Sequence, residues 1–260
     1  MSQATVQLER MDGVALVWLN RPEAYNAFDL PTIGALATRL MDLARDSGVR
    51  AVVLGGRGRA FCAGGDLKWV LSQPGSPGAA FHRLAASYHQ AITEIRTMPK
   101  PVVAAVHGPA AGGGFSLALA CDFRVLADTA VLRQAYTSNG LCIDGGGTFT
   151  LPRLVGLARA LEIAALDRPI SAADALAWGL ATRVVPADRC LDEALELVRE
   201  IRGRSSHSFA LSKLLLNESF SHSLAEQLEL ERQGLVAAGE HPHGHEGMTA
   251  FTEKRKPDFS

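Results

Sequence analysis

The chain has 260 residues, of which 47% are hydrophobic and 20% charged, and its formal net charge at pH 7 is -1. These values are typical of a soluble globular protein with one domain and an appendage, and the balanced charge argues against a dedicated nucleic-acid-binding face. The four cysteines lack Cys-x-x-Cys spacing, and the first ten residues lack the pattern of a signal peptide, so we expect a cytoplasmic protein with reduced thiols.

The first elements in chain order are a hairpin and a helix. Residues 6–19 read VQLERMDGVALVWL, in which the pair Asp12-Gly13 predicts the turn between two strands. Asp29 is the expected N-cap of the helix that follows. The apolar residues of this helix recur at helical spacing: Ile33, Leu36, Leu40 and Leu43.

The middle of the chain predicts repeating units of strand and helix. Apolar runs at 51–54 and 101–106 indicate buried strands, with a helix expected near 79–97 between them. Further strands are expected near 122–127 and 183–185.

Two other segments predict no strand. Residues 73–78, read QPGSPG, indicate a flexible loop. From about residue 202 onward the pattern favours helices alone, with prominent leucines at positions 211, 214, 215, 224, 228 and 235.

Each of two predicted buried strands runs into a glycine-rich loop. The first loop, residues 55–67, reads GGRGRAFCAGGDL, and the second contains the triplet 112–114 ahead of an apolar segment that suits a short buried helix. Glycine lets a ligand approach the backbone closely, and the first N–H groups of a helix have no partner inside that helix. Two such loops could place two backbone donors around one oxygen. Plain glycine turns are the alternative.

Known glycine motifs fit these loops poorly. A dinucleotide-binding fingerprint starting at Gly56 would need glycine in place of Phe61, and no Gly-Lys-Ser/Thr follows either loop. The stretch GFSLA at 114–118 approaches the Gly-x-Ser-x-Gly elbow of serine hydrolases around Ser116, but its last position is Ala118.

The segment 101–120 has the length of a membrane span and carries no Asp, Glu, Lys or Arg. Prolines, glycines and His107 interrupt it. A strand, a loop and a buried helix explain it better, so we expect no membrane span.

Five motifs in order resemble the enoyl-CoA hydratase/isomerase (crotonase) family. They are LNRPEAYNA at 19–27, AFCAGGDL at 60–67, KPVVAAVHGPAAGGG at 100–114, LPRLVG at 151–156 and EGMTAFTEKRKPDF at 246–259. The resemblance implies an α/β fold, a crotonase-like spiral of ββα repeats. It implies a core at 1–200 that binds acyl-CoA and a C-terminal helical region at 201–260 for oligomerisation, as a homotrimer or a dimer of trimers.

The resemblance also implies a site. The backbone N–H groups of Gly65 and Gly113 would hold the thioester oxygen of an acyl-CoA substrate, with no cofactor beyond the coenzyme A of the substrate itself. The remaining family positions that would contact the coenzyme A are Ala63, Asp66, Leu67 and Lys68 along the first loop, and Phe251 and Lys254 near the C-terminus, often from an adjoining subunit. No metal is expected, because the histidines at 241–245 have no Cys or carboxylate set at ligand spacing.

The chain departs from the hydratase pattern at two positions. The two glutamates that activate water in family hydratases fall on Ser116 and Tyr136, and neither side chain is an effective general base. Both residues stay candidates for substrate contact. Asp144 falls where double-bond isomerases of the family, including dienoyl-CoA and 1,2-epoxyphenylacetyl-CoA isomerases, carry an aspartate. The alternative is an aspartate that caps the turn ahead of its glycines.

The same aspartate position is the nucleophile of family members that resemble 4-chlorobenzoyl-CoA dehalogenase. His89 matches the activating histidine of that branch, although Tyr136 stands where the branch has tryptophan, and we expect His89 to have no role. Isomerisation by Asp144 is therefore the favoured hypothesis. Hydration, dehalogenase-like hydrolysis, a serine hydrolase and a non-catalytic acyl-CoA-binding protein stay open.

Overall fold

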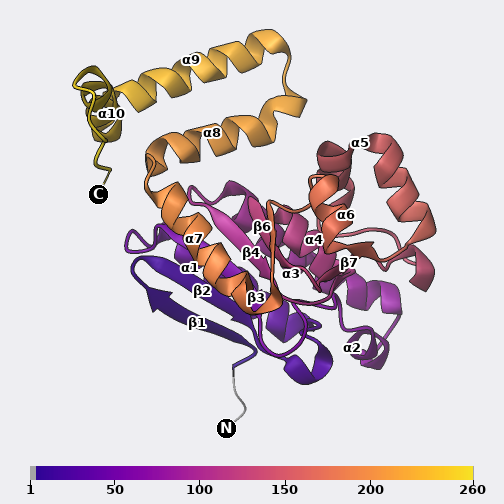
Figure 1. Ribbon diagram of the computed structural model, residues 1–260. Helices are drawn as coiled ribbons and strands as arrows, with labels where there is room; N and C mark the ends of the chain where they lie inside the picture. The colour runs from indigo at the N-terminus through magenta and orange to yellow at the C-terminus, as the bar shows by residue number, and fades with distance from the viewer. Residues whose placement is uncertain (1–3, 260) are drawn as a thin grey trace.

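The computed structural model describes residues 4–259 and shows two sheets with helices around them (Figure 1). The larger sheet has six strands in the order β1-β2-β3-β4-β6-β9. Strands β1 (Val6–Met11) and β2 (Val14–Leu19) form the expected antiparallel hairpin. Asp12 and Gly13 turn between them with φ of 48° and 73°, as a tight hairpin turn requires.

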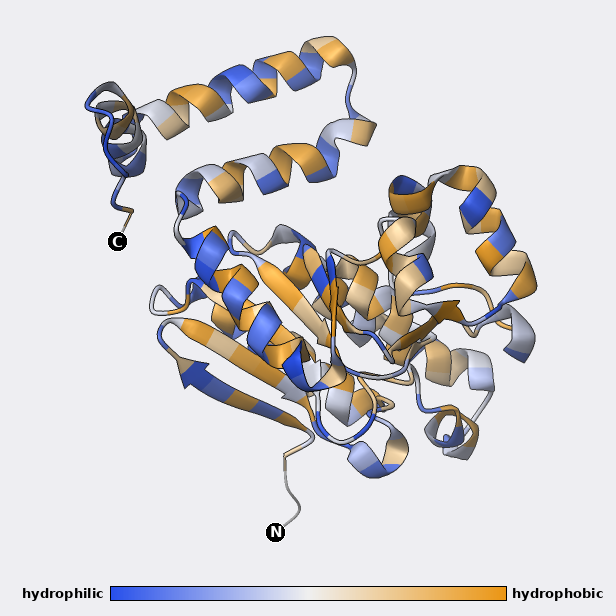
Figure 2. Ribbon diagram, in the orientation of Figure 1, coloured by the Kyte–Doolittle hydropathy of each residue, from blue (hydrophilic) through white to orange (hydrophobic). Residues whose placement is uncertain are grey.

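The remaining strands of this sheet are parallel. They are β3 (Ala51–Gly56), β4 (Val102–Val106), β6 (Phe123–Ala127) and β9 (Arg183–Val185). Every residue of β3 and β4 is buried, which is typical of strands covered on both faces. Figure 2 shows these strands as a largely hydrophobic layer.

Two groups of helices cover the sheet. On one side α1 (Leu30–Arg45) packs against α3 (Pro77–Thr97), with α2 (Leu67–Ser72) beside it. Helix α7 (Cys190–Arg202) contacts β3, β4 and β6 (Figure 1). Helix α1 begins as expected, because the Asp29 side chain accepts a hydrogen bond from the Thr32 N–H.

A second, three-stranded sheet has the order β5-β7-β8. Its strands are β5 (Ala110–Ala111), β7 (Val131–Arg133) and β8 (Ile170–Ser171). Around it lie α4 (Gly113–Ala120), α5 (Gly147–Leu166), which is broken at Gly156, and α6 (Ala172–Ala177). The short buried helix expected after the glycine triplet is confirmed, since all eight residues of α4 are buried.

The chain ends in α8 (Ser206–Glu218), α9 (Leu224–Glu240) and α10 (Pro242–Thr252), which extend away from the sheets in Figure 1. Single 3-10 turns lie at Pro22–Ala24, Thr137–Asn139, Ala187–Arg189 and Ser219–Ser221. The helix-only pattern expected from about residue 202 is confirmed. Residues 1–3 and 260, at the ends of the two predicted regions, lie outside the described part.

The loop expected at 73–78 is partly wrong. Pro77 and Gly78 are the first residues of α3, because the Ser76 side chain accepts a hydrogen bond from the Ala79 N–H and so caps that helix.

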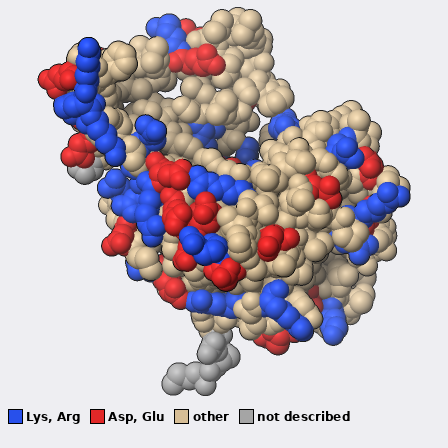
Figure 3. All heavy atoms as spheres, in the orientation of Figure 1, with Lys and Arg blue, Asp and Glu red and all other residues tan. Residues whose placement is uncertain are grey.

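Among residues 4–259, no helix combines the length and apolar character that a membrane span requires. Acidic and basic side chains are interspersed on the face that Figure 3 shows.

Candidate active site

A cavity of about 110 Å³ lies where the two glycine loops meet α3. Its walls come from the first loop and β2–α1 connection, from α3, from the start of α4, and from the segment that leads into α5. The lining residues are Phe28, Ala63, Gly65, Leu67, Phe81, Leu84, Ala85, Tyr88, Gly112, Gly113, Ala135, Tyr136, Asn139, Leu141 and Asp144. The cavity therefore brings together the three residues that the sequence predicts to be catalytic.

The two glycine loops touch at Gly64. This residue has φ of +90°, and a Cβ added to it would lie 2.6 Å from the Gly113 nitrogen and 2.8 Å from the Ala111 oxygen. Glycine is required on both counts, for the backbone conformation and for the close approach. The contact sets the first loop directly against the start of α4.

The backbone amides of Gly65 and Gly113 share two properties. Both residues line the cavity, and no hydrogen bond donated by either amide is found within residues 4–259. Gly113 is the first residue of α4, so its N–H has no carbonyl partner inside the helix. Two unsatisfied donors in one cavity can bind an oxygen that gains negative charge.

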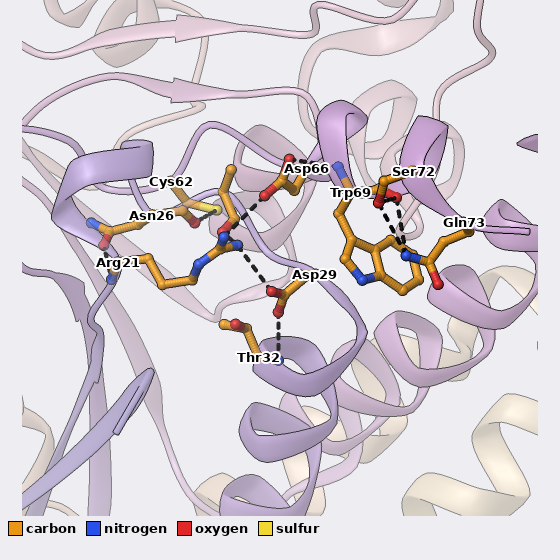
Figure 4. Close-up of polar contacts among 10 residues, drawn as sticks. Arg21, Asn26, Asp29, Thr32, Cys62, Asp66, Trp69, Ser72 and Gln73 are labelled. Atoms are coloured by element: carbon orange, nitrogen blue, oxygen red, sulfur yellow. Dashed lines mark hydrogen bonds and ion pairs between the residues drawn. The ribbon is translucent and has the colours of Figure 1, made fainter. Parts of the chain in front are cut away.

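A network behind the first loop holds it in place (Figure 4). The Arg21 guanidinium donates to Asp66 at 3.0 Å and to the Ala27 carbonyl at 2.7 Å, and lies 3.5 Å from Asp29. Asp66 also caps α2 by accepting from the Trp69 N–H at 3.1 Å. Burial alone would raise the pKa of Asp66, but these hydrogen bonds outweigh it and lower the pKa.

The predicted coenzyme A contacts on this loop separate into three kinds. Ala63 and Leu67 line the cavity, whereas Lys68 is exposed. Asp66 is absent from the cavity lining, and its carboxylate is engaged by Arg21 and α2. The Asp66 carboxylate thus connects the first loop to Arg21 and to the start of α2.

Asp144 lies in the cavity wall with its side chain 34% exposed. Its Oδ1 is 2.5 Å from the His89 Nε2 and accepts from the Gly145 N–H at 2.5 Å. Both hydrogen bonds fall on Oδ1, and within residues 4–259 no bond to Oδ2 is found. One carboxylate oxygen is therefore left for a substrate, while the other is fixed by the turn and by α3.

His89 lies against the proposed base, whereas its sequence position left open whether it has any role. It projects from α3 onto Asp144, although 55 residues separate the two in the chain. The alternative reading of Asp144 as a turn cap is also met in part, because the Gly145 N–H binds its side chain and the Gly147 N–H binds its carbonyl at 3.1 Å.

Ser116 and Tyr136 occupy the two positions at which family hydratases have glutamates. Tyr136 lines the cavity, and burial raises the pKa of its phenol, partly offset by the nearby Ser116 hydroxyl and the Asp144 amide. The Ser116 Oγ is fully buried and has no hydrogen bond of good geometry among the described residues. A buried serine with no bonded base does not support the hydrolase elbow.

The C-terminal candidates lie outside the cavity of the same chain. Phe251, on α10, is 85% exposed, and Lys254 is also exposed. Residues 4–259 hold no group of three or more His, Cys, Asp or Glu side chains arranged to bind a metal ion. The histidines around 241–245 pack on one another instead, as in the stacked pair His207 and His241 with ring centroids 3.9 Å apart.

Sequence reasoning missed Phe28 and Tyr88 in the cavity wall. Tyr88 is buried, and its hydroxyl donates to the Gly113 carbonyl. Its spacing with Leu84, Ile92 and Ile95 could have placed it on the buried face of α3. Nothing in that spacing predicts which backbone carbonyl it reaches.

Comparison with known proteins identifies the family of this chain. The model of the enoyl-CoA hydratase/isomerase family matches residues 9–260. The chain belongs to this family. Its members act on CoA thioesters, so the chain is an enzyme of that class, and the predicted crotonase-like α/β fold is confirmed.

The proteins to which this chain is similar have names that indicate different reactions. The chain is 37% identical over 252 residues to 1,2-epoxyphenylacetyl-CoA isomerase of Escherichia coli strain K12, covering 95% of both chains. It is 34% identical to 4-chlorobenzoyl coenzyme A dehalogenase-2 of an Arthrobacter species, covering 96% of this chain and 91% of the relative. The crystal structure of an enoyl-CoA hydratase from Polaromonas sp. JS666 superimposes with a TM-score of 0.92 at 37% identity, over 97% and 98% of the chains.

Proposed function

We propose that this enzyme moves a double bond within the acyl group of a CoA thioester. One observation carries the proposal: the unsatisfied amides of Gly65 and Gly113 share a cavity with a single accessible carboxylate, that of Asp144. Ser116 and Tyr136 stand where hydration would need two carboxylates. One base with an oxygen-binding site suits proton transfer better than water addition.

The proposed reaction has two proton transfers. The Asp144 carboxylate takes a proton from the carbon at one end of the allylic unit, and the electron pair of that C–H bond becomes delocalised onto the thioester oxygen. The amides of Gly65 and Gly113 bind the resulting enolate oxygen. The protonated carboxyl group then returns the proton to the other end of the unit, so the product is an isomer and the aspartate is restored.

The acyl group of this substrate has room beyond the base. A second cavity of about 450 Å³ shares Phe81, Ala85, Tyr136, Leu141 and Asp144 with the first. Its other lining residues are Gly78, His82, Cys142 and Ile143. We propose that the acyl group passes Asp144 and extends into this space. The coenzyme A moiety would extend in the other direction, along Ala63, Leu67 and Lys68.

Dehalogenase-like hydrolysis is the second candidate, because His89 contacts Asp144. In that reaction the Asp144 carboxylate would attack an aryl carbon and release halide. Water deprotonated by His89 would then cleave the aryl ester, which restores the carboxylate and yields a hydroxyaryl product. His89→Gln separates the candidates, since it should abolish the hydrolysis and leave isomerisation within about tenfold.

Turnover of a panel of 2-enoyl-, 3-enoyl- and aryl-CoA thioesters in ²H₂O, followed by mass spectrometry, tests the proposal. Isomerisation gives a product with the substrate's elemental composition, which chromatography separates from the substrate and which carries deuterium where the protonated Asp144 exchanges with solvent before it returns the proton. Hydration adds one water, and dehalogenation replaces halogen by hydroxyl. A product with added water and no isomer would overturn the proposal. Tight binding of every thioester without any product would favour a non-catalytic relative.

We also propose that the enzyme works in the cytoplasm as a homotrimer or a dimer of trimers. Large apolar side chains are exposed along the C-terminal helices, and α9 has no buried residue in the single chain. These side chains include Leu214, Leu216, Phe220, Leu224, Leu228, Leu235, Val236, Met248 and Phe251. An apolar surface of this extent on a soluble protein is typical of a subunit interface.

A further inference from the structure

Tyr88 contacts two parts of the cavity wall, the start of α4 and the loop that carries Asp144. It lies in the middle of α3, is 1% exposed, and donates its hydroxyl hydrogen to the carbonyl of Gly113. Its ring packs on Phe28, with centroids 4.8 Å apart and planes tilted by 37°. The proposed reaction assigns no proton transfer to this buried phenol.

The start of α4 depends on contacts from outside the helix. Its N-cap is Gly112, which has no side chain to cap the exposed N–H groups. A Cβ added to Gly113 would lie 2.6 Å from the Phe28 ring, so that ring already fills the space beside the amide. Tyr88 fixes the carbonyl of the same residue, and together the two rings hold the first turn of α4.

The other side of Tyr88 supports the loop that carries Asp144. Gly145 has φ of +62°, and a Cβ added there would overlap the Tyr88 ring and hydroxyl. The backbone just after Asp144 therefore rests on the same side chain. The neighbouring residue of α3, His89, fixes the Asp144 carboxylate.

We propose that Tyr88 is a positioning residue that sets the separation between the Gly113 amide and the Asp144 carboxylate. Acting through these two groups, it aligns the bound thioester oxygen with the base. The kinetic consequence of this inference rests on the proposed function. The effect of Tyr88 on the Gly113 amide, by contrast, concerns any acyl-CoA that binds in the cavity. Burial raises the pKa of Tyr88, which keeps the phenol a neutral hydrogen-bond donor.

The test compares Tyr88→Phe with Tyr25→Phe, which removes the hydroxyl of a partly exposed tyrosine outside the cavity. The probe is 4-(dimethylamino)cinnamoyl-CoA, whose absorption shifts to the red when its carbonyl is polarised. At saturation, Tyr88→Phe should reduce the red shift and lower kcat about tenfold to a hundredfold, because small misplacements of reacting groups have effects of this size. KM, the affinity for free coenzyme A, which has no thioester oxygen, and the Tyr25→Phe variant should match wild type.

Full red shift and full kcat in Tyr88→Phe would overturn the inference, as would a loss of affinity for free coenzyme A parallel to kcat. A purely structural role would lower Tm and leave the shift intact. Gly145→Ala displaces the same ring from the other side, so it too must reduce the shift if Tyr88→Phe does not fold. If the wild-type enzyme shifts the absorption of the probe but turns over no isomerase substrate, the proposed function is refuted. The change in the shift caused by Tyr88→Phe then still decides this inference.

Discussion

The two oxygens of the Asp144 carboxylate have different surroundings, and this difference supports a base with one working oxygen. His89 and the Gly145 N–H both bind Oδ1. Asp144→Asn keeps the size of the side chain but removes its ability to take a proton. We expect turnover to fall about 10²- to 10⁴-fold, the usual contribution of a general base.

Binding provides the control for this variant. Calorimetric affinity for acetyl-CoA should stay within about threefold of wild type, since the amides of Gly65 and Gly113 are untouched, and three-fold corresponds to well under 1 kcal/mol. Undiminished turnover by Asp144→Asn would end the role of Asp144 as base.

The glycines of the cavity are expected to differ in their tolerance of a side chain. A Cβ on Gly113 would meet the Phe28 ring at 2.6 Å, whereas one on Gly65 would be 3.5 Å from Leu84, an ordinary contact. Gly113→Val should therefore block the oxygen from its donor and reduce kcat by about 10²- to 10³-fold, the effect of losing one such donor.

Gly65→Ala is the matched control for the folded state, with a Tm close to wild type. Gly64→Ala should be the least stable of the three, because φ is +90° and the added Cβ would lie 2.6 Å from the Gly113 nitrogen. Differential scanning calorimetry gives this order, and equal Tm values for the Gly64 and Gly65 variants would contradict it.

Sequence reasoning at this scale succeeded where the chemistry is local. The glycine triplet and the loop at 60–67 are contiguous motifs, and the structure places both beside one cavity. The contacts of His89 with Asp144 and of Tyr88 with Gly113 join residues 55 and 25 positions apart. Such pairs depend on how α3 packs across the loops, which no spacing within a single element reveals.

Among the elements, α8 is attached to the rest of the chain by a buried ion pair, in addition to the Phe209 ring stacked on Phe123 and the hydrogen bond from Asn217 to the Arg96 carbonyl. The Lys213 ammonium donates to Asp122 at 2.8 Å and to the carbonyls of Ile95 and Lys100 at 2.8 Å and 3.1 Å. Burial raises the pKa of Asp122 and lowers the pKa of Lys213. The pair is thus held by its geometry against the cost of burying charge.

Lys213→Met should lower the free energy of unfolding by about 3–5 kcal/mol, because it leaves the Asp122 carboxylate buried without its bonded cation. A carboxyl group whose pKa is raised by folding is stabilising below its unfolded pKa, and that contribution is lost as the pH rises through the folded pKa. The deficit of the variant should therefore shrink as the pH falls from about 7 toward 4.

Urea denaturation across this pH range measures the effect, with the exposed Lys256→Met as the control. Asp122→Asn combined with Lys213→Met should recover part of the loss, since no buried charge then stays unpaired. A deficit that is constant with pH would show that lost packing, and not the uncompensated carboxylate, explains the change.

The strands that sequence patterns missed are short, and the helices α5 and α7 were not predicted either. Strands β5 and β8 have two residues each and β7 has three, too few for an alternation of apolar and polar residues to show. The longer apolar runs of β3 and β4 and the capped helix α1 were predicted, because burial on both faces and a side-chain cap leave clear signals. The main sheet could thus be predicted, but not the second sheet that carries the approach to α4.

For the whole molecule, the proposed assembly predicts a contribution of α10 to coenzyme A binding in a neighbouring subunit. Phe251 and Lys254 match family positions that contact the adenosine-phosphate end, yet neither lines the cavity of its own chain. In Figure 1 the C-terminal helices extend away from the sheets. We therefore expect these residues to contact coenzyme A bound in the cavity of a neighbouring subunit.

Disrupting the assembly should therefore weaken coenzyme A binding without touching the cavity. We expect Leu228→Glu with Leu235→Glu on α9 to convert the proposed trimer or hexamer to monomers in sedimentation velocity, because both side chains are more than half exposed in the single chain. Met11→Glu, at an exposed apolar residue on β1, is the control.

Phe251→Ala should cost about tenfold in acetyl-CoA affinity in the assembled enzyme, or about 1.4 kcal/mol. It should cost nothing further in the monomeric background, since the residue and the interface act through one contact. Equal and additive losses would show that Phe251 acts without the neighbouring subunit, which would contradict the connection between assembly and binding.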